Sequence, residues 1–215
     1  MPLPLAHSLA AVAVYKGLDA DGTLAAWPRL LLAVVIANAA DLDYVPGVLA
    51  GEPNLYHHVG FSHSGVFALA AGLAVAWLAA AAGRRWPVAA ERLSAVSGTA
   101  LMVSLLLLSH VLLDSLNRDL RPPAGVPMFW PVSDVAVNAY PWFVETAKLG
   151  GEGSPWEFVL SLLAIHNLYA LAWEAATLFP VIAVVAWWRA RHDQRRSIAG
   201  NPDGNQTPER SKPGS

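Results

Sequence analysis

The sequence predicts an all-α fold, a polytopic helical membrane protein with about five apolar helices, an extramembrane loop and a disordered C-terminal tail. The first observation is composition: 55% of the 215 residues are hydrophobic and only 14% are charged, whereas soluble domains carry roughly 25% charged residues. The second is that apolar runs such as 65–83 are long enough to cross a bilayer. The third is that the polar motifs fall at the ends of these runs.

The helices are expected in five apolar stretches that polar connections separate. These stretches are residues 3–16, 29–40, 65–83, 94–116 and 156–189. The last stretch is long enough for one span plus an interfacial segment, or for a tight hairpin. Pro46 is expected to end the second helix, because a proline disfavours helical geometry at the preceding residue, Val45.

The remaining segments define the predicted domain organisation. Residues 117–155 are rich in proline, glycine and aromatic side chains, and are expected to form an ordered extramembrane loop. Residues 1–191 would then be one membrane-embedded helical domain, and the polar residues 192–215 a disordered tail. The start of the chain, residues 1–16, lacks the positive charge and the cleavage pattern of a signal peptide.

The distribution of basic residues predicts the orientation in the membrane. If the connections alternate between two sides, one side holds most of the cationic residues: Lys16, Arg29, Arg84, Arg85, Arg92, Arg189, Arg191, Arg195, Arg196, Arg210 and Lys212. The other side holds only Arg118, Arg121 and Lys148. The positive-inside rule then places the N-terminus outside and the C-terminus in the cytoplasm of a bacterial-type inner membrane. The net charge of −2 and the lack of a basic stripe argue against direct nucleic-acid binding.

The histidines and aspartates at the ends of the apolar runs are the candidate metal ligands. In the predicted topology they all fall at the outer membrane face: His7, Asp41, Asp43, His58, His63, His110 and Asp114. The chain has no cysteine, which excludes thiolate ligands and disulfides. Histidine and carboxylate donors suit zinc as the first choice, with manganese or iron as alternatives. A divalent metal with an open position supplies a nucleophilic water near neutral pH.

Each motif also has a structural interpretation. His110 and Asp114 are four residues apart, so a helix places them on one face, where they could bind one metal or form a hydrogen bond at a helix end. Asp41 and Asp43 follow an apolar run and could be a solvated helix terminus. The three histidines of segment 57–63 could belong to an interfacial loop, and His57 is expected to face solvent.

The order of these motifs resembles the YdjM-like family. The resemblance rests on His7 in the first helix, Asp41-x-Asp43 followed by a proline, His58-x-Gly60-x-Ser62-His63-Ser64, His110-x-x-x-Asp114 and a later Phe129-Trp130-Pro131. The family's central motif usually reads His-Arg-Gly-x-Thr-His-Ser, so Val59 stands here in place of an arginine and Ser62 in place of a threonine. The family is described as LexA-binding, inner-membrane-associated and metal-dependent hydrolases.

The resemblance implies a fold and a function. The motif order is also similar to the all-helical, zinc-dependent phospholipase C and single-strand nuclease fold, whose later His-x-x-x-Glu pair has no match here because Ala170 follows His166. This similarity implies a phosphoester substrate and metal ligands at His7, Asp43, His58, His110 and Asp114. Together with the predicted topology, it favours hydrolysis of a phosphoester or lipid-like substrate at the outer face, with Asp43, His63 and Asp114 as the catalytic candidates. Two alternatives stay open. One is a metal or ion transporter, and the other is a non-catalytic membrane partner in a stress response that binds a cytoplasmic protein through its tail.

Overall fold

The computed structural model describes residues 2–18, 27–50, 61–82, 89–117, 125–144 and 163–200, with the single positions 146, 156 and 160. These residues form six α-helices, two short 3-10 helices and no strand, which confirms the all-α prediction for the described part of the chain. The α-helices are α1 (Pro4–Leu18), α2 (Trp27–Ala37), α3 (Tyr44–Leu49), α4 (Gly65–Ala82), α5 (Ala89–Ser115) and α7 (Ile165–Gly200). The 3-10 helices are η2 (Ala39–Asp43) and η3 (Phe61–His63).

Two helices among the described residues are long and apolar enough to cross a membrane. They are the parts of α5 and α7 that run over Ser97–Ser115 and Ile165–Arg196. A third span results if α2 and the segment Ala39–Leu49 count as one helix with a bend of 50° between its halves. Helix α4 contains a shorter apolar stretch, Gly65–Leu78. The fold is therefore that of a membrane protein, and a complete set of five spans stays a prediction.

Two local predictions differ from the structure. Pro46 does not end a helix but lies in the first turn of α3, together with Val45. A proline is tolerated there because the first N–H groups of a helix have no partner within the helix. Residues 192–200, predicted to belong to a disordered tail, are helical instead, because α7 extends to Gly200. Of the two forms left open for the stretch 156–189, a hairpin is absent from Ile165 onward, where α7 is continuous. Positions 201–215 lie outside the described residues.

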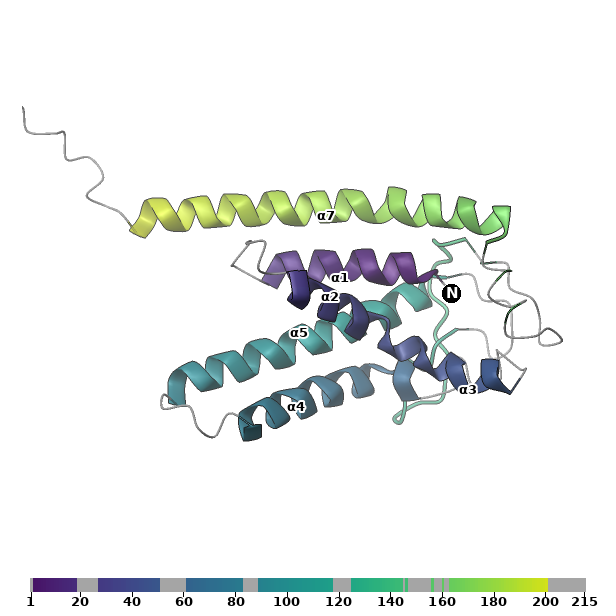
Figure 1. The fold of residues 1–215 in the computed structure, drawn as a ribbon, viewed down its shortest axis with the longest axis horizontal. Helices are drawn as coiled ribbons and strands as arrows, with labels where there is room; N and C mark the ends of the chain where they lie inside the picture. The colour runs from purple at the N-terminus through teal and green to yellow at the C-terminus, as the bar shows by residue number, and fades with distance from the viewer. Residues whose placement is uncertain are drawn as a thin grey trace, which may run out of the picture.

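Helix α1 is the centre of the bundle and packs against α2, α5 and α7 (Figure 1). Its buried face is made of small side chains, among them Ala6, Ala10 and Ala11, and α2 contributes Ala33 and Ala37. Alanines let helix axes approach closely. Because lipid tails are as apolar as the side chains, the hydrophobic effect does not drive helices together in a membrane, and van der Waals packing between close helices stabilises them instead. The close approach also brings the first turn of α1 against the last turns of α5.

Gly72 allows a similarly close approach between α4 and α5. A Cβ atom at Gly72 would lie 2.6 Å from the carbonyl oxygen of Ala100 and would also overlap Ser104 Oγ. We expect Gly72→Ala to lower the free energy of unfolding by about 1–3 kcal/mol, because the helices must move apart. Thermal unfolding in detergent measures the loss. Gly98→Ala is the control, since a Cβ there meets nothing within 4 Å, and equal effects of the two substitutions would contradict this packing.

The segment 125–144 covers the end of the bundle at which α4 begins. Val126 and Val137 exchange two backbone hydrogen bonds of 3.0 and 2.8 Å, which fold the segment back on itself. The N–H of Gly65 donates to the carbonyl of Met128 over 2.9 Å. The segment is therefore ordered, as the sequence predicts for this part of the loop, and it is fixed to the start of α4.

Candidate metal centre

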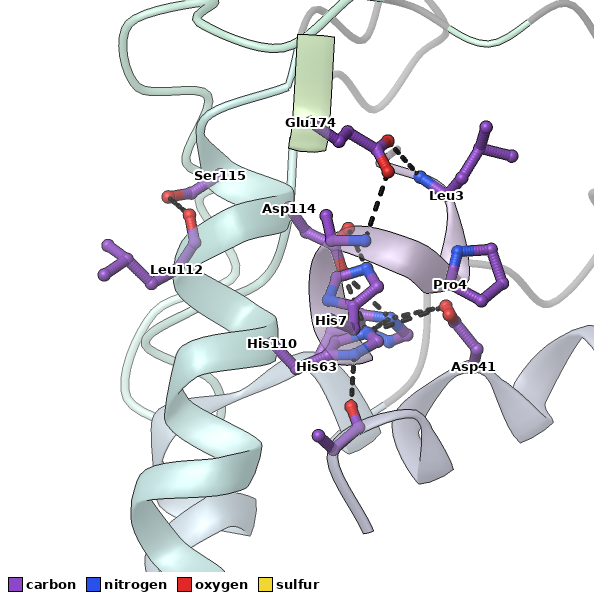
Figure 2. Close-up of polar contacts among 12 residues, drawn as sticks. Leu3, Pro4, His7, Asp41, His63, His110, Leu112, Asp114, Ser115 and Glu174 are labelled. Atoms are coloured by element: carbon purple, nitrogen blue, oxygen red, sulfur yellow. Dashed lines mark hydrogen bonds and ion pairs between the residues drawn. The ribbon is translucent and has the colours of Figure 1, made fainter. Parts of the chain in front are cut away.

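Four side chains from three separate segments converge at one end of the bundle (Figure 2). They come from η2, η3 and two successive turns of α5, and each offers one ligand atom: Asp41, His63, His110 and Asp114. All four ligand atoms lie within 4.8 Å of one another. This arrangement brings together residues that are more than 70 positions apart at its extremes.

The distances place two imidazole nitrogens and two carboxylates around one point. The Nε2 atoms of His63 and His110 are 3.3 Å apart. Asp114 Oδ2 lies 3.0 Å from Nε2 of His110 and 3.5 Å from Nε2 of His63. Asp41 Oδ1 lies 3.6 Å from Nε2 of His110 and 3.8 Å from Nε2 of His63. The centre is therefore a compact set of two nitrogen and two oxygen donors.

The opposite nitrogen of each imidazole is held by a second partner. Nδ1 of His110 donates to the backbone carbonyl of Ala37 over 2.7 Å, because a carbonyl can only accept. Nδ1 of His63 lies 3.1 Å from Oδ2 of Asp43, and Ser62 Oγ donates to the same carboxylate oxygen over 3.4 Å. Such partners fix the ring orientation and the tautomer of a metal-binding histidine. Both histidines are therefore arranged to present Nε2 to the centre.

Burial makes a cation at this point favourable. The side chains of His63, His110 and Asp114 are fully buried, and that of Asp41 is 15% exposed. Both carboxylate oxygens of Asp41 have no hydrogen-bond partner among the described residues, and a buried carboxylate without compensation is costly. Burial would lower the pKa of His63, but the nearby carboxylates of Asp41 and Asp43 outweigh it and raise this pKa to about 9. A positive charge thus belongs between these groups, and a divalent cation fits the donor set.

His7 lies beside the four-residue group. Its ring stacks on that of His110, with centroids 3.8 Å apart and planes inclined by 21°. Its Nε2 is 3.6 Å from Oδ1 of Asp114, the carboxylate oxygen that faces away from His63 and His110. His7 is fully buried, and neither ring nitrogen has a hydrogen-bond partner among the described residues. Asp114 therefore connects His7 to the centre.

Comparison with known proteins places this arrangement in a family. The family model described as "YdjM inner membrane protein" matches residues 1–193. The chain belongs to the YdjM inner membrane protein family. This match confirms the resemblance that the histidine and aspartate motifs indicate. No curated protein and no solved structure matches the chain.

The YdjM family motifs occupy different positions at the centre. Of the predicted ligands, Asp41, His63, His110 and Asp114 form the group itself. His7 contacts it through Asp114, and Asp43 contacts it through the far nitrogen of the His63 ring. His58 lies outside the described residues. His63 is the histidine of this motif that lies among the described residues, and it faces the centre.

Two groups near the centre of this YdjM family member were missed by the sequence reasoning. The carbonyl of Ala37 has no sequence signal, since any residue supplies one. Glu174 does have a signal, because it is the one acid in the long apolar part of α7, and ionisable residues within a membrane span are functional candidates. Its carboxylate accepts the backbone N–H of Leu3 over 2.6 Å and that of Ala6 over 3.1 Å. Glu174 therefore fixes the first turn of α1, which carries His7 (Figure 2).

Proposed function

We propose that this chain is a membrane-embedded, metal-dependent hydrolase that acts on a phosphoester or lipid-like substrate at the outer membrane face. The observation that carries the proposal is the convergence of the two Nε2 atoms and two carboxylates within 4.8 Å. The partners of the two Nδ1 atoms strengthen it, because metal-binding histidines usually have their other ring nitrogen held by a carboxylate or a backbone carbonyl.

The donor set favours zinc, with manganese or iron as alternatives. Bound here, such a metal would supply Lewis acidity and a nucleophilic water near neutral pH. His63, His110 and Asp114 would hold it, and Asp43 would orient His63. Asp41 is the ligand with partial exposure, so a substrate would approach from its side.

The apolar residues beside the ligands support a lipid-like substrate. Leu42, between the two aspartates of η2, is 65% exposed, and Phe61, two positions before His63, is 56% exposed. Phe61 also lies near Trp130 of the covering segment, with ring centroids 6.2 Å apart. Exposed apolar side chains at the open side of a polar centre suit a substrate with an acyl chain. A metal site at the lipid–water interface would provide such access.

The orientation of the protein is part of the proposal. The centre lies at the end of the bundle opposite the basic end of α7 (Figure 1). The positive-inside rule places that basic end in the cytoplasm and the centre at the outer face. Cysteine-accessibility labelling of intact cells would test this directly, since the parent chain has no cysteine.

Asp43→Asn tests whether this carboxylate orients His63. We expect zinc affinity to fall about 10- to 100-fold, as for other outer partners of metal-binding histidines, with hydrolysis falling in parallel. Zinc titration of the detergent-purified protein, followed by phospholipid and soluble phosphodiester assays, measures both. Asp134→Asn is the matched control, because Asp134 is exposed in the covering segment. Unchanged zinc affinity of Asp43→Asn would remove Asp43 from the site.

The same assays separate hydrolysis from the rival functions. A transporter would move metal across proteoliposome membranes without cleaving any phosphoester. A non-catalytic partner in a stress response would keep its cellular activity after His110→Ala and lose it when residues 192–215 are deleted. A protein that purifies without metal and takes up none at neutral pH would end the hydrolase proposal.

A further inference from the structure

The basic end of α7 contains a pocket that the proposed hydrolase site does not use. It has a volume of about 160 Å³ and is lined by two tryptophans, two arginines and a histidine: Trp187, Trp188, Arg191, Arg195 and His192. The pocket lies where the apolar part of the helix ends and the basic part begins. It therefore combines an apolar wall with a concentration of positive charge.

Helix geometry separates the cations of α7 into two sets. At 100° per residue, Arg191 and Arg195 lie on the same side as Trp187, whereas Arg189 and Arg196 lie on the opposite side. Arg189 already has partners, since its Nε lies 3.4 Å from Asp193 Oδ2 and its Nη1 donates to the carbonyl of Gly17 over 3.4 Å. Arg191 and Arg195, on the pocket side, form no ion pair with a carboxylate among the described residues.

Ring contacts hold the Arg191 and His192 side chains of the pocket in place. The Arg191 guanidinium lies over the Trp187 ring, 4.3 Å from its centroid. The His192 ring stacks on Trp188 with centroids 5.6 Å apart, and its Nδ1 is 3.8 Å from Asp193 Oδ1. A guanidinium placed flat on a ring still directs its N–H groups outward, where they can bind two oxygens of a phosphate.

The surface next to the pocket is suited to an acyl chain. Val184 and Val181 lie on the same side of α7, about one and two turns before Trp187 and Trp188. They are 62% and 44% exposed. Tryptophans concentrate at the membrane interface, so the pocket is at the level of the lipid headgroups and the valines are at the level of the chains.

We propose that this pocket binds the phosphate of an anionic phospholipid in the leaflet that the basic end of α7 enters. Arg191 and Arg195 would bind the phosphate oxygens, Trp187 and Trp188 would contact the glycerol region, and one acyl chain would lie along Val184 and Val181. The C-terminal part of α7, which carries the pocket residues, lies at the opposite end of the molecule from the first turn of α1, which lies beside the metal centre (Figure 1). This lipid is therefore a bound structural partner and not the substrate.

The test compares two neighbouring arginines in the full-length protein. Native mass spectrometry in a neutral detergent would measure retention of phosphatidylglycerol and of phosphatidylcholine. We expect the wild-type protein to retain the anionic lipid preferentially. Arg195→Ala should lower that preference about fivefold, because each arginine near an anionic lipid surface contributes about 1 kcal/mol. The double substitution Arg191→Ala/Arg195→Ala should lower it further. Arg196→Ala removes the same charge from the opposite side and should have little effect.

Three results would overturn the proposal. Equal losses in Arg195→Ala and Arg196→Ala would mean that net charge alone attracts the lipid. Release of phosphatidylglycerol by millimolar inorganic phosphate would mean that the pocket takes a free anion. A wild-type protein without lipid preference would leave the pocket to a soluble partner. The side chains of Arg191, Arg195 and Arg196 are exposed, so the substitutions leave the fold intact.

Discussion

His110→Ala is expected to abolish high-affinity zinc binding. The substitution removes one of four converging donors. It also removes the hydrogen bond by which α5 contacts the Ala37 carbonyl at the end of α2. If a zinc binding free energy of about 10–16 kcal/mol is shared among four ligands, one ligand contributes about 2.5–4 kcal/mol, or roughly a 100- to 1000-fold change in affinity. Metal content after dialysis against buffered zinc, measured by inductively coupled plasma mass spectrometry, checks this.

Two further variants make the result specific. Ser109→Ala changes the preceding residue, whose hydroxyl donates to the carbonyl of Leu106 within α5 over 2.7 Å, and should leave zinc affinity unchanged. Asp114→Asn keeps the shape of the side chain and removes its charge, so it should lose zinc even if His110→Ala is poorly folded. Full zinc occupancy in both His110→Ala and Asp114→Asn would show that the cluster is not a metal site.

Glu174→Ala is expected to cause the largest loss of stability. The carboxylate is 1% exposed and accepts two backbone N–H groups at the start of α1. Removing it takes away the acceptor of the Leu3 N–H and leaves the Ala6 N–H with its 3.0 Å bond to the Leu3 carbonyl. Hydrogen bonds to charged groups contribute about 1.5–3 kcal/mol each. We expect the free energy of unfolding to fall by about 2–4 kcal/mol, since the cost of burying the carboxylate offsets part of the gain. Detergent unfolding followed by circular dichroism measures it.

The loss of the Glu174 contacts should also disturb the metal centre, because they fix the first turn of α1 and His7 in that turn contacts His110 and Asp114. Glu174→Gln keeps an acceptor of the same shape and should recover about half of the loss. Thr177→Ala is the control, since Thr177 accepts an exposed hydrogen bond from Trp142 Nε1 over 3.2 Å one turn further along α7. If Glu174→Ala unfolds like Thr177→Ala, the carboxylate does not fix α1.

Much of the fold could be predicted from the sequence because apolar runs determine where helices form in a membrane. The run at 65–83 corresponds to α4, and that at 94–116 to α5. The four-residue spacing of His110 and Asp114 correctly predicts that they share a face of a helix. The alternating topology also correctly predicts that Asp41 and His63 lie near His110 and Asp114. Asp41 follows the apolar run 29–40 and His63 precedes the run 65–83, so both fall on the same side of the membrane.

The rest depends on interactions between segments. An Asp-x-Asp motif does not indicate which carboxylate faces the centre, and the 3-10 geometry of η2 decides that Asp41 does while Asp43 contacts Nδ1 of His63. The proline rule fails at Pro46, because a new helix begins at Tyr44 and the rule for its first turn applies instead. The role of Glu174 depends on a contact with Leu3, which no local pattern contains.

The distance along the chain between Glu174 and Leu3 has a consequence for biogenesis. The two partners are separated by 171 residues, and ribosomes add about 5–20 residues per second. The first turn of α1 therefore waits roughly 10–30 s for its carboxylate while the intervening helices enter the bilayer. During this interval His110 and Asp114 emerge before α1 is fixed beside them. Because the four donors of the centre lie at positions 41–114, all are made before Glu174, and the centre can form before the last helix fixes the first turn of α1 beside it.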